Sequence, residues 1–337
     1  MMCLLYCGTQ LDAQSNNRRN DNRQSDNRQT DNRQTDNRQT DDSQTDDKKK
    51  DKKKIPPVEV VEIKTKDKVV LEASFYGSIN EKEAVPVILL HDWDGNRTQM
   101  ETYAESLQKQ GFAVIVPDLR GHGNSMFMED GTELKPDKWK PAEIATAVAD
   151  IEACKKFLVG KNNEGELNID QLSVVAEGVS CIHAVRWTIS DWQFGDARGY
   201  LAGIKQGKDV KSLVLMGPPK SYRSMNLSQD LKSELFSSDD NRAMPIFILG
   251  DQDRSEKSVR ESKALYTTLK RKRNVGKNSR RPNCYYFVYY TKEQRKLAHP
   301  EDWSGDKAEL AAALAHFING QAERFKDSNR WQDRSRN

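Results

Sequence analysis

One segment of the chain, Leu172 to Ala184, has the residue pattern of a buried strand, a sharp turn and a helix. Enzymes that attack a carbonyl carbon place a serine at the tip of such a turn, in the pattern small-x-Ser-x-small, because the turn exposes the hydroxyl while strand and helix pass closely. Ala176 and Ser180 supply the two small positions, but the central residue is Gly178. The segment therefore predicts the scaffold of a nucleophile elbow without a reactive side chain at its tip.

Backbone strain explains how a glycine is tolerated at this tip. The turn forces its central residue into a conformation that is unfavourable for any residue with a Cβ, so a change from serine to glycine relieves roughly 1–3 kcal/mol. Glu177 faces away from the tip, and Ser180 and Cys181 belong to the first turn of the helix. We expect none of the three to replace the missing nucleophile.

Strands and helices alternate through most of the chain, which is typical of a doubly wound α/β sheet. Several strands read as continuous apolar runs, and such runs indicate a parallel sheet that helices cover on both faces. The expected strands are 58–63, 69–75, 85–90, 112–116, 172–175, 210–216, 245–249 and 284–290. The expected helices are 98–109, 141–158, 180–189, 259–269 and 306–318. The pattern predicts a mostly parallel sheet of about eight strands, opened by an antiparallel hairpin, with little or no lid.

A motif in the first half of the sheet resembles the α/β-hydrolase family. The strand 85–90 ends at His91, and the next strand ends in Asp118-Leu119-Arg120-Gly121-His122-Gly123-Asn124-Ser125. The family carries Asp-x-Arg-Gly-x-Gly-x-Ser at this point. The resemblance covers residues from about 57 to 320, and it is greatest to a bacterial group that includes monoacylglycerol-lipase-like and serine-aminopeptidase-like proteins.

The resemblance implies an oxyanion hole beside the elbow. Its first donor is the backbone N–H of Trp93, and its second is the N–H of Val179, the residue after the nucleophile position. The family has a glycine where this chain has Asp92. That residue adds a carboxylate near a place that should stabilise negative charge.

The resemblance also implies an acid and a base for a catalytic triad. The acid is Asp253 in a turn after the strand 245–249, with Asp251 as the second choice, and the base is His299 in the loop after the last strand. In a triad the histidine takes the proton of the serine hydroxyl and the carboxylate stabilises the imidazolium. Without that hydroxyl, His299 has only water to activate.

Three classes of function are compatible with these residues. The first is a pseudo-hydrolase with Gly178 at the nucleophile position, which binds or regulates without catalysis. The alternative is an active esterase, lipase or peptidase that uses water or a non-standard nucleophile. A third class is an anchored structural protein whose tether matters more than its pocket.

No cofactor or metal is implied by the residues or by the resemblance. The five cysteines are scattered without CxxC spacing or nearby histidines, which argues against a zinc site. The formal charge of +3 is nearly balanced, so we expect no nucleic acid as a partner. A small acyl-type ligand in the pocket is the one partner class that the resemblance suggests.

The predicted N-terminal tail is 1–54, and its residues from Asp12 to Lys54 contain almost nothing to bury. From Asp21 the pentapeptide DNRQS or DNRQT runs four times, and a run of aspartates and lysines then ends at Lys54. Such repeats have no apolar face, so we expect a disordered tail that tethers the domain, with polyanion binding by Lys48–Lys54 as the alternative. The predicted α/β-hydrolase domain is 55–320, followed by a polar C-terminal tail, 321–337.

The apolar start, Met1 to Cys7, is short for a signal peptide and lacks a basic n-region. If translation begins upstream, these residues are the remnant of an export signal cleaved near Ala13. The sequence leaves two locations open, an exported one, secreted or periplasmic, and a cytoplasmic one. No run of about 20 apolar residues occurs, so we expect no transmembrane segment.

Overall fold

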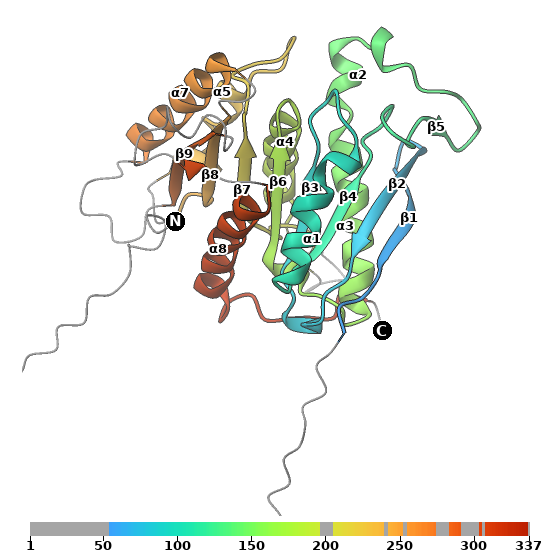
Figure 1. The fold of residues 1–337 in the computed structure, drawn as a ribbon. Coiled ribbons are helices and arrows are strands. Elements are labelled where there is room, and N and C mark those ends of the chain that lie inside the picture. Colours follow the sequence, from blue (N-terminus) through green and yellow to red (C-terminus); the bar gives the residue numbers. More distant parts are fainter. Residues whose placement is uncertain are drawn as a thin grey trace, which may run out of the picture. The chain divides into compact units, whose positions relative to one another are not determined.

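The apolar runs of the sequence form one mixed sheet in the computed structural model (Figure 1). The model describes residues 54–195, 205–238, 242–251, 255–273, 283–290, 303–304 and 307–335. The strands are β1 (Val58–Lys64), β2 (Val69–Tyr76), β3 (Pro86–Leu90), β4 (Ala113–Pro117), β6 (Leu172–Glu177), β7 (Val210–Met216), β8 (Ile246–Asp251) and β9 (Cys284–Tyr290). Two short strands, β5 (Phe127–Met128) and β10 (Trp303–Ser304), extend the sheet.

The strand order is β1-β2-β4-β3-β6-β7-β8-β9-β10, and β5 pairs with β2. β1 and β2 form the expected antiparallel hairpin, and β2 is also antiparallel to β4. All neighbours from β4 to β10 are parallel. The carboxyl ends of the central strands therefore meet at one edge of the sheet, where ligands of open α/β sheets bind.

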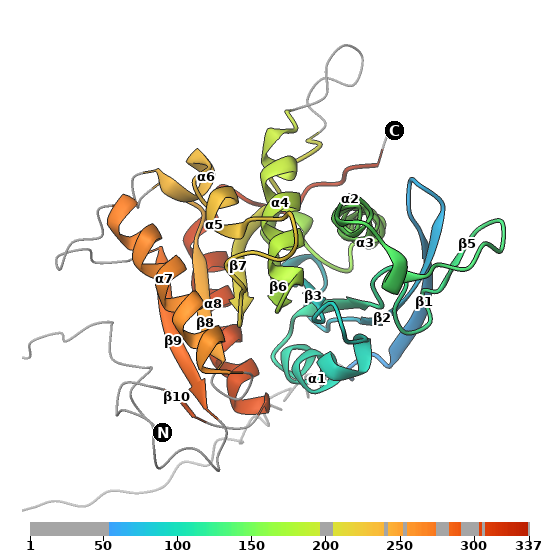
Figure 2. The same ribbon diagram turned by 90° about the horizontal axis from the view of Figure 1, so that it is seen from above.

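Helices cover both faces of this sheet, as Figure 2 shows from above. The helices are α1 (Glu101–Lys109), α2 (Pro141–Ala145), α3 (Val148–Asn163), α4 (Ser180–Gln193), α5 (Leu227–Asp230), α6 (Glu234–Ser237), α7 (Glu256–Lys272) and α8 (Lys307–Phe325). On β6, Val174 belongs to the core shared with α3, α4 and α7, whereas Val175 belongs to the core shared with α1 and α8. Burial on both faces explains why the strands lack alternation, and it confirms the doubly wound α/β-hydrolase fold.

Some elements differ from the expected ones. The single helix expected at 141–158 is two helices, α2 and α3, because the chain makes three-residue turns between them. There the N–H of Ala147 donates to the C=O of Ile144 at 3.2 Å, and the N–H of Ala149 to the C=O of Thr146 at 2.9 Å. α8 continues to Phe325, beyond its expected end near Ile318. The described residues of the β7–β8 connection, 217–238 and 242–245, hold only the one-turn helices α5 and α6, in keeping with little or no lid.

The motif after β4 orders the loop beside the elbow. Asp118 accepts the backbone N–H groups of Arg97 at 2.7 Å and Asn124 at 3.0 Å, and it also pairs with the Arg97 guanidinium. The side chain of Arg120 is 4% exposed and lies 2.8 Å from a carboxylate oxygen of Asp150. Burial raises the pKa of Asp150 to about 6, although the positive charge of Arg120 opposes this rise. These residues hold the turn in place.

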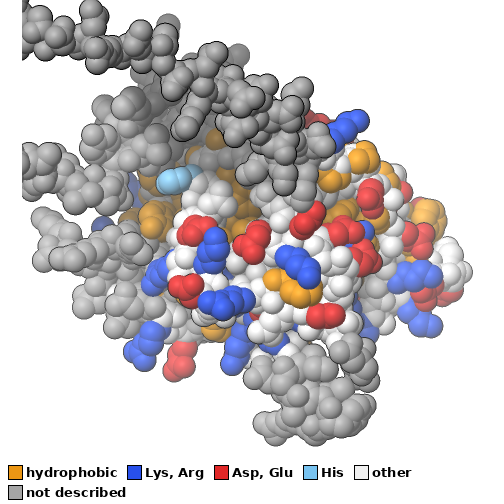
Figure 3. All heavy atoms as spheres, turned by 90° about the horizontal axis from the view of Figure 1, so that it is seen from below, with side chains coloured by type: hydrophobic (Ala, Val, Ile, Leu, Met, Phe, Trp, Pro, Cys, Tyr) orange, Lys and Arg blue, Asp and Glu red, His pale blue; other side chains and the backbone are white. Residues whose placement is uncertain are grey.

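Seen from below, the domain carries basic and acidic side chains interspersed over the visible face (Figure 3). Among the described residues, no helix is long and apolar enough to cross a membrane.

Candidate functional site

The segment around Gly178 has the backbone of a sharp strand-turn-helix. Gly178 lies between β6 and α4 with φ of +56°, in the left-handed region where a Cβ is strained. Its N–H donates to the C=O of Met216 at 2.8 Å, which ties the tip to the end of β7. The hydroxyl of Ser180 donates to the C=O of His91 at 2.6 Å and so joins α4 to the loop after β3.

The carboxylate of Asp92 lies against the tip of this turn. Its Oδ1 accepts the backbone N–H of Val179 at 2.7 Å and the backbone N–H of Trp93 at 2.8 Å. These are the two donors that the resemblance assigns to an oxyanion hole. A carboxylate oxygen of the protein itself therefore sits where such a hole would hold the oxyanion of a tetrahedral intermediate.

The same carboxylate also fills the space of a side chain at position 178. A Cβ built on Gly178 would lie 2.6 Å from Oδ2 of Asp92, and closer still to its Oδ1 and Cγ. Real Cβ atoms do not approach other heavy atoms so closely. A serine at position 178 and the observed conformation of Asp92 thus exclude each other, and the two residues form a complementary pair.

We expect Gly178→Ala to lower the free energy of unfolding by about 2–4 kcal/mol. The new Cβ adds left-handed backbone strain of about 1–2 kcal/mol and displaces Asp92 from two charge-assisted hydrogen bonds. Gly160→Ala in α3 is the matched control, because a Cβ there meets nothing within 4 Å. That helix substitution should instead stabilise by about 0.5–1 kcal/mol. Urea denaturation measures the change in unfolding free energy of both variants. Equal changes would contradict an overlap between a Cβ at position 178 and the Asp92 carboxylate.

His91 holds the turn that carries Asp92. Its Nδ1 lies 2.6 Å from the C=O of Asp92, and its Nε2 accepts the backbone N–H of Leu119 at 3.0 Å. These two contacts fix the neutral tautomer with the proton on Nδ1. Burial lowers the pKa of His91 to about 4. The imidazole is thus a neutral structural group at neutral pH.

A cluster of buried and partly buried rings lies behind the hole. The Trp93 ring is 4.7 Å from the His122 ring, 5.3 Å from the His183 ring and 5.9 Å from the Trp139 ring, centroid to centroid. Trp93 is only 4% exposed. The indole of Trp93 therefore belongs to the core, and Trp93 contacts the Asp92 carboxylate through its backbone N–H.

His183 is the least expected member of this cluster. It lies on α4, is fully buried, and neither ring nitrogen has a hydrogen-bond partner. Burial, with a smaller contribution from the positive charge of Arg186, lowers its pKa to about 4. The helical pattern of the sequence around His183 does not show which groups its ring faces.

Two of the predicted site residues, Asp253 and His299, lie outside the described residues. Asp251, the second choice for the acid, ends β8 and is partly buried. The structure therefore brings together Gly178, Val179 and Trp93, and it adds Asp92 as the residue that contacts all three. Among the described histidines, cysteines and carboxylates, no group of three or more is placed to hold a metal ion.

Comparison with known proteins supports the fold through structure alone. No protein-family model matches the chain, and no curated protein matches its sequence. The Pyrococcus furiosus esterase Pf2001 superposes with a TM-score of 0.52 at 17% identity, covering 79% of this chain and 91% of the esterase. A Pyrobaculum calidifontis esterase gives a TM-score of 0.51 at 14% identity, covering 80% of this chain and 87% of the other. The structural neighbours are esterases of the α/β-hydrolase fold, and at these identities they show the fold only.

Proposed function

We propose that this α/β-hydrolase-fold protein is a non-catalytic binding or regulatory pseudo-hydrolase with a degenerate triad. The observation that carries the proposal is the carboxylate of Asp92, which takes both candidate oxyanion donors and the space of a nucleophile at Gly178. Acyl transfer requires both an attacking group and free donors for the developing charge. The motif from Asp118 to Ser125 supports placing the chain with the monoacylglycerol-lipase-like and serine-aminopeptidase-like bacterial group.

The ligand class that we propose is a small acyl compound. The N–H groups of Trp93 and Val179 already bind a carboxyl oxygen, that of Asp92. A ligand carboxylate or acyl carbonyl that displaces Asp92 would meet the same two donors. Binding would then depend on how readily Asp92 leaves them.

The proposal is tested by hydrolysis of p-nitrophenyl acetate together with labelling by a serine-directed phosphonate. We expect no labelling and a rate within about tenfold of the same protein after denaturation, because loss of a nucleophile lowers kcat by about 10⁶. Saturable turnover that disappears in a His299→Ala variant would overturn the proposal.

One observation favours a working hydrolase as a second candidate. Asp92 places a carboxylate at the tip where the nucleophile is missing, and it is only partly buried. As a general base it would activate a water molecule for attack on an acyl carbon. This candidate requires that Asp92→Asn abolishes a turnover that the wild type possesses.

A further inference from the structure

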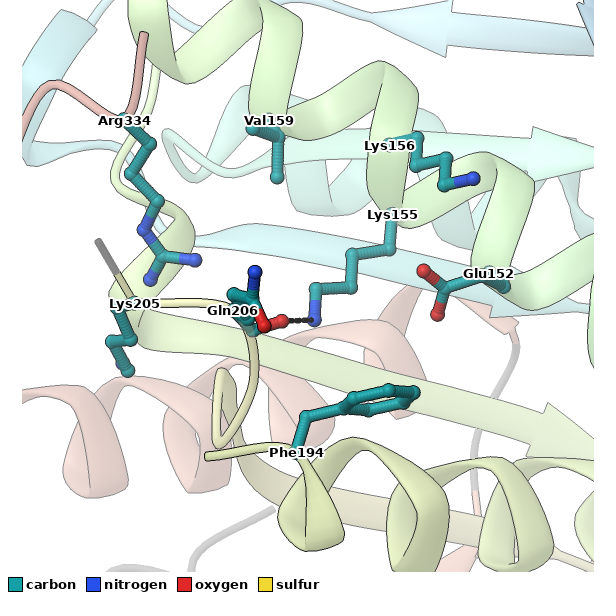
Figure 4. Close-up of a pocket in the computed structure, with 8 residues that line it drawn as sticks. All are labelled: Glu152, Lys155, Lys156, Val159, Phe194, Lys205, Gln206 and Arg334. Atoms are coloured by element: carbon teal, nitrogen blue, oxygen red, sulfur yellow. Dashed lines mark hydrogen bonds between the residues drawn. The ribbon is translucent and has the colours of Figure 1, made fainter. Parts of the chain in front are cut away.

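A hollow of about 410 Å³ opens at the opposite end of β7 from the elbow (Figure 4). Lys205 and Gln206 on its rim precede the first residue of β7, Val210, whereas Gly178 hydrogen-bonds to the last residue, Met216. The hollow is therefore separate from the elbow. Its lining residues are Glu152, Lys155, Lys156, Val159, Phe194, Lys205, Gln206 and Arg334.

Buried ion pairs fix the cationic wall of this hollow. Lys155 Nζ lies 2.5 Å from Asp191 Oδ1 and 2.9 Å from Asp209 Oδ2. The guanidinium of Arg334 lies 2.5 Å from Asp209 Oδ1 and 2.7 Å from Asp170 Oδ1. The side chains of these five residues are at most 6% exposed. The cationic groups are therefore held in place before any ligand arrives, which lowers the entropy lost on binding.

Donors remain after these pairs are formed. Nε of Arg334 is buried without a hydrogen-bond partner, and Figure 4 shows this guanidinium directed into the hollow. Lys155 Nζ also donates to the C=O of Gln206 at 3.1 Å, so its three protons are used. Lys156 is exposed on α3. Lys205 is 23% exposed at the rim, and its Nζ already pairs with Asp170 and, at 3.1 Å, with Asp209, which leaves one of its three protons for a ligand. A buried, unused donor is costly, at about 1–3 kcal/mol, unless a bound group accepts from it.

The local charge is positive on balance. Five basic residues lie in or beside the hollow, and four acidic ones face them: Lys155, Lys156, Lys205, Lys211 and Arg334 against Glu152, Asp170, Asp191 and Asp209. Burial and, to a smaller extent, the positive charge of Lys205 lower the pKa of Lys211 to about 8, although the negative charges of Asp209, Asp170 and Asp191 oppose this shift. The excess of basic over acidic side chains favours an anion over a cation as the ligand.

The remaining wall is apolar. The Phe194 side chain, just after α4, is 53% exposed, and Val159 of α3 stands on the lining with it. An exposed phenylalanine beside fixed cations offers surface for the apolar part of an amphiphilic ligand. The hollow thus has a cationic wall and an apolar wall that face the same space.

We propose that this hollow binds a small organic anion. Its carboxylate or phosphate group pairs with Lys156 and Lys205 beside the Arg334 guanidinium, whose unpartnered Nε–H adds a favourable dipole. Its aryl or short alkyl body lies on Phe194 and Val159. The site is independent of the function proposed for the elbow.

Isothermal titration of the full chain with benzoate and with phenyl phosphate tests the proposal. We expect a Kd of about 0.1–1 mM for at least one of them, in keeping with an open, shallow site. Benzyl alcohol, which lacks the charge, and inorganic phosphate, which lacks the ring, should each bind at least about tenfold more weakly. The tighter of the two organic anions identifies the headgroup.

Two surface variants locate the site without disturbing the buried ion pairs. Lys156→Ala and Phe194→Ser should each weaken binding at least about fivefold. Lys263→Ala, which removes an exposed lysine of α7, is the matched control and should bind like the wild type. Arg334 is left intact, because its loss would strand the buried carboxylate of Asp209. No heat with either anion, equal binding of benzyl alcohol, or equal affinity in all three variants would overturn the proposal.

Discussion

The double variant Asp92→Gly/Gly178→Ser is expected to gain esterase activity that neither single variant shows. The serine restores the nucleophile, and removal of the carboxylate frees the N–H groups of Trp93 and Val179 for the oxyanion. Nucleophile loss in a triad costs about 10⁶ in kcat and loss of one oxyanion donor about 10²–10³, so even partial recovery should exceed about 10²-fold. Hydrolysis of p-nitrophenyl acetate by the four proteins measures the gain.

The single variants separate the two losses. Gly178→Ser alone keeps a carboxylate that overlaps the new side chain, and Asp92→Gly alone has no attacking group. His299→Ala in the double variant should abolish the gain if His299 is the base that the resemblance implies. If Gly178→Ser alone is as active as a folded double variant, Asp92 does not block the site.

Acid is expected to destabilise the fold strongly between pH 6.5 and pH 4. His91 and His183 are fully buried, and burial lowers the pKa of each from 6.5 to about 4. In this window the two rings are protonated in the unfolded chain but not in the folded chain, so their contribution lowers the free energy of unfolding as the pH falls. Asp150, whose pKa burial raises to about 6, opposes them and offsets roughly one of the two rings. The loss is about 2 kcal/mol for each histidine at pH 5 and about 3 kcal/mol at pH 4, against a total stability of about 5–15 kcal/mol for typical proteins.

The variant His183→Leu tests this pH dependence. It removes one titrating ring whose nitrogens have no partner, so the fall in stability from pH 7 to pH 5 should shrink by about 2 kcal/mol. His316→Leu, a change of an exposed histidine on α8, serves as the surface control. Urea denaturation at the two pH values gives the difference, and an unchanged slope for His183→Leu would show that this ring is not kept neutral.

Much of the fold could be predicted because buried parallel strands leave a plain pattern. The run 172–175 is apolar except for Ser173, and the structure buries Val174 and Val175 on opposite faces of the sheet. The prediction of one unbroken helix over 141–158 was wrong, because nothing in the sequence marks the turn at Thr146 and Ala147. The local hydrophobic pattern thus predicts whether a segment is a strand or a helix better than it predicts where a helix breaks.

The site was less accessible to sequence reasoning, because its central contact joins distant residues. Both Asp92 and Gly178 stand out as departures from the family pattern. Their relation does not, since Asp92 and Val179 are 87 positions apart and meet only when β3 lies beside β6. The partnerless ring of His183 and the hollow beside Arg334 likewise depend on tertiary packing.

A double-mutant cycle in unfolding free energy, with Asp92→Gly and Gly178→Ala, tests the complementary pair most directly. If the Asp92 carboxylate occupies the space of a side chain at position 178, Gly178→Ala should be less destabilising once that carboxylate is gone. We expect the effect of Gly178→Ala to shrink by about 1–2 kcal/mol in the Asp92→Gly background. Additive effects, with a coupling within about 0.3 kcal/mol of zero, would contradict the account.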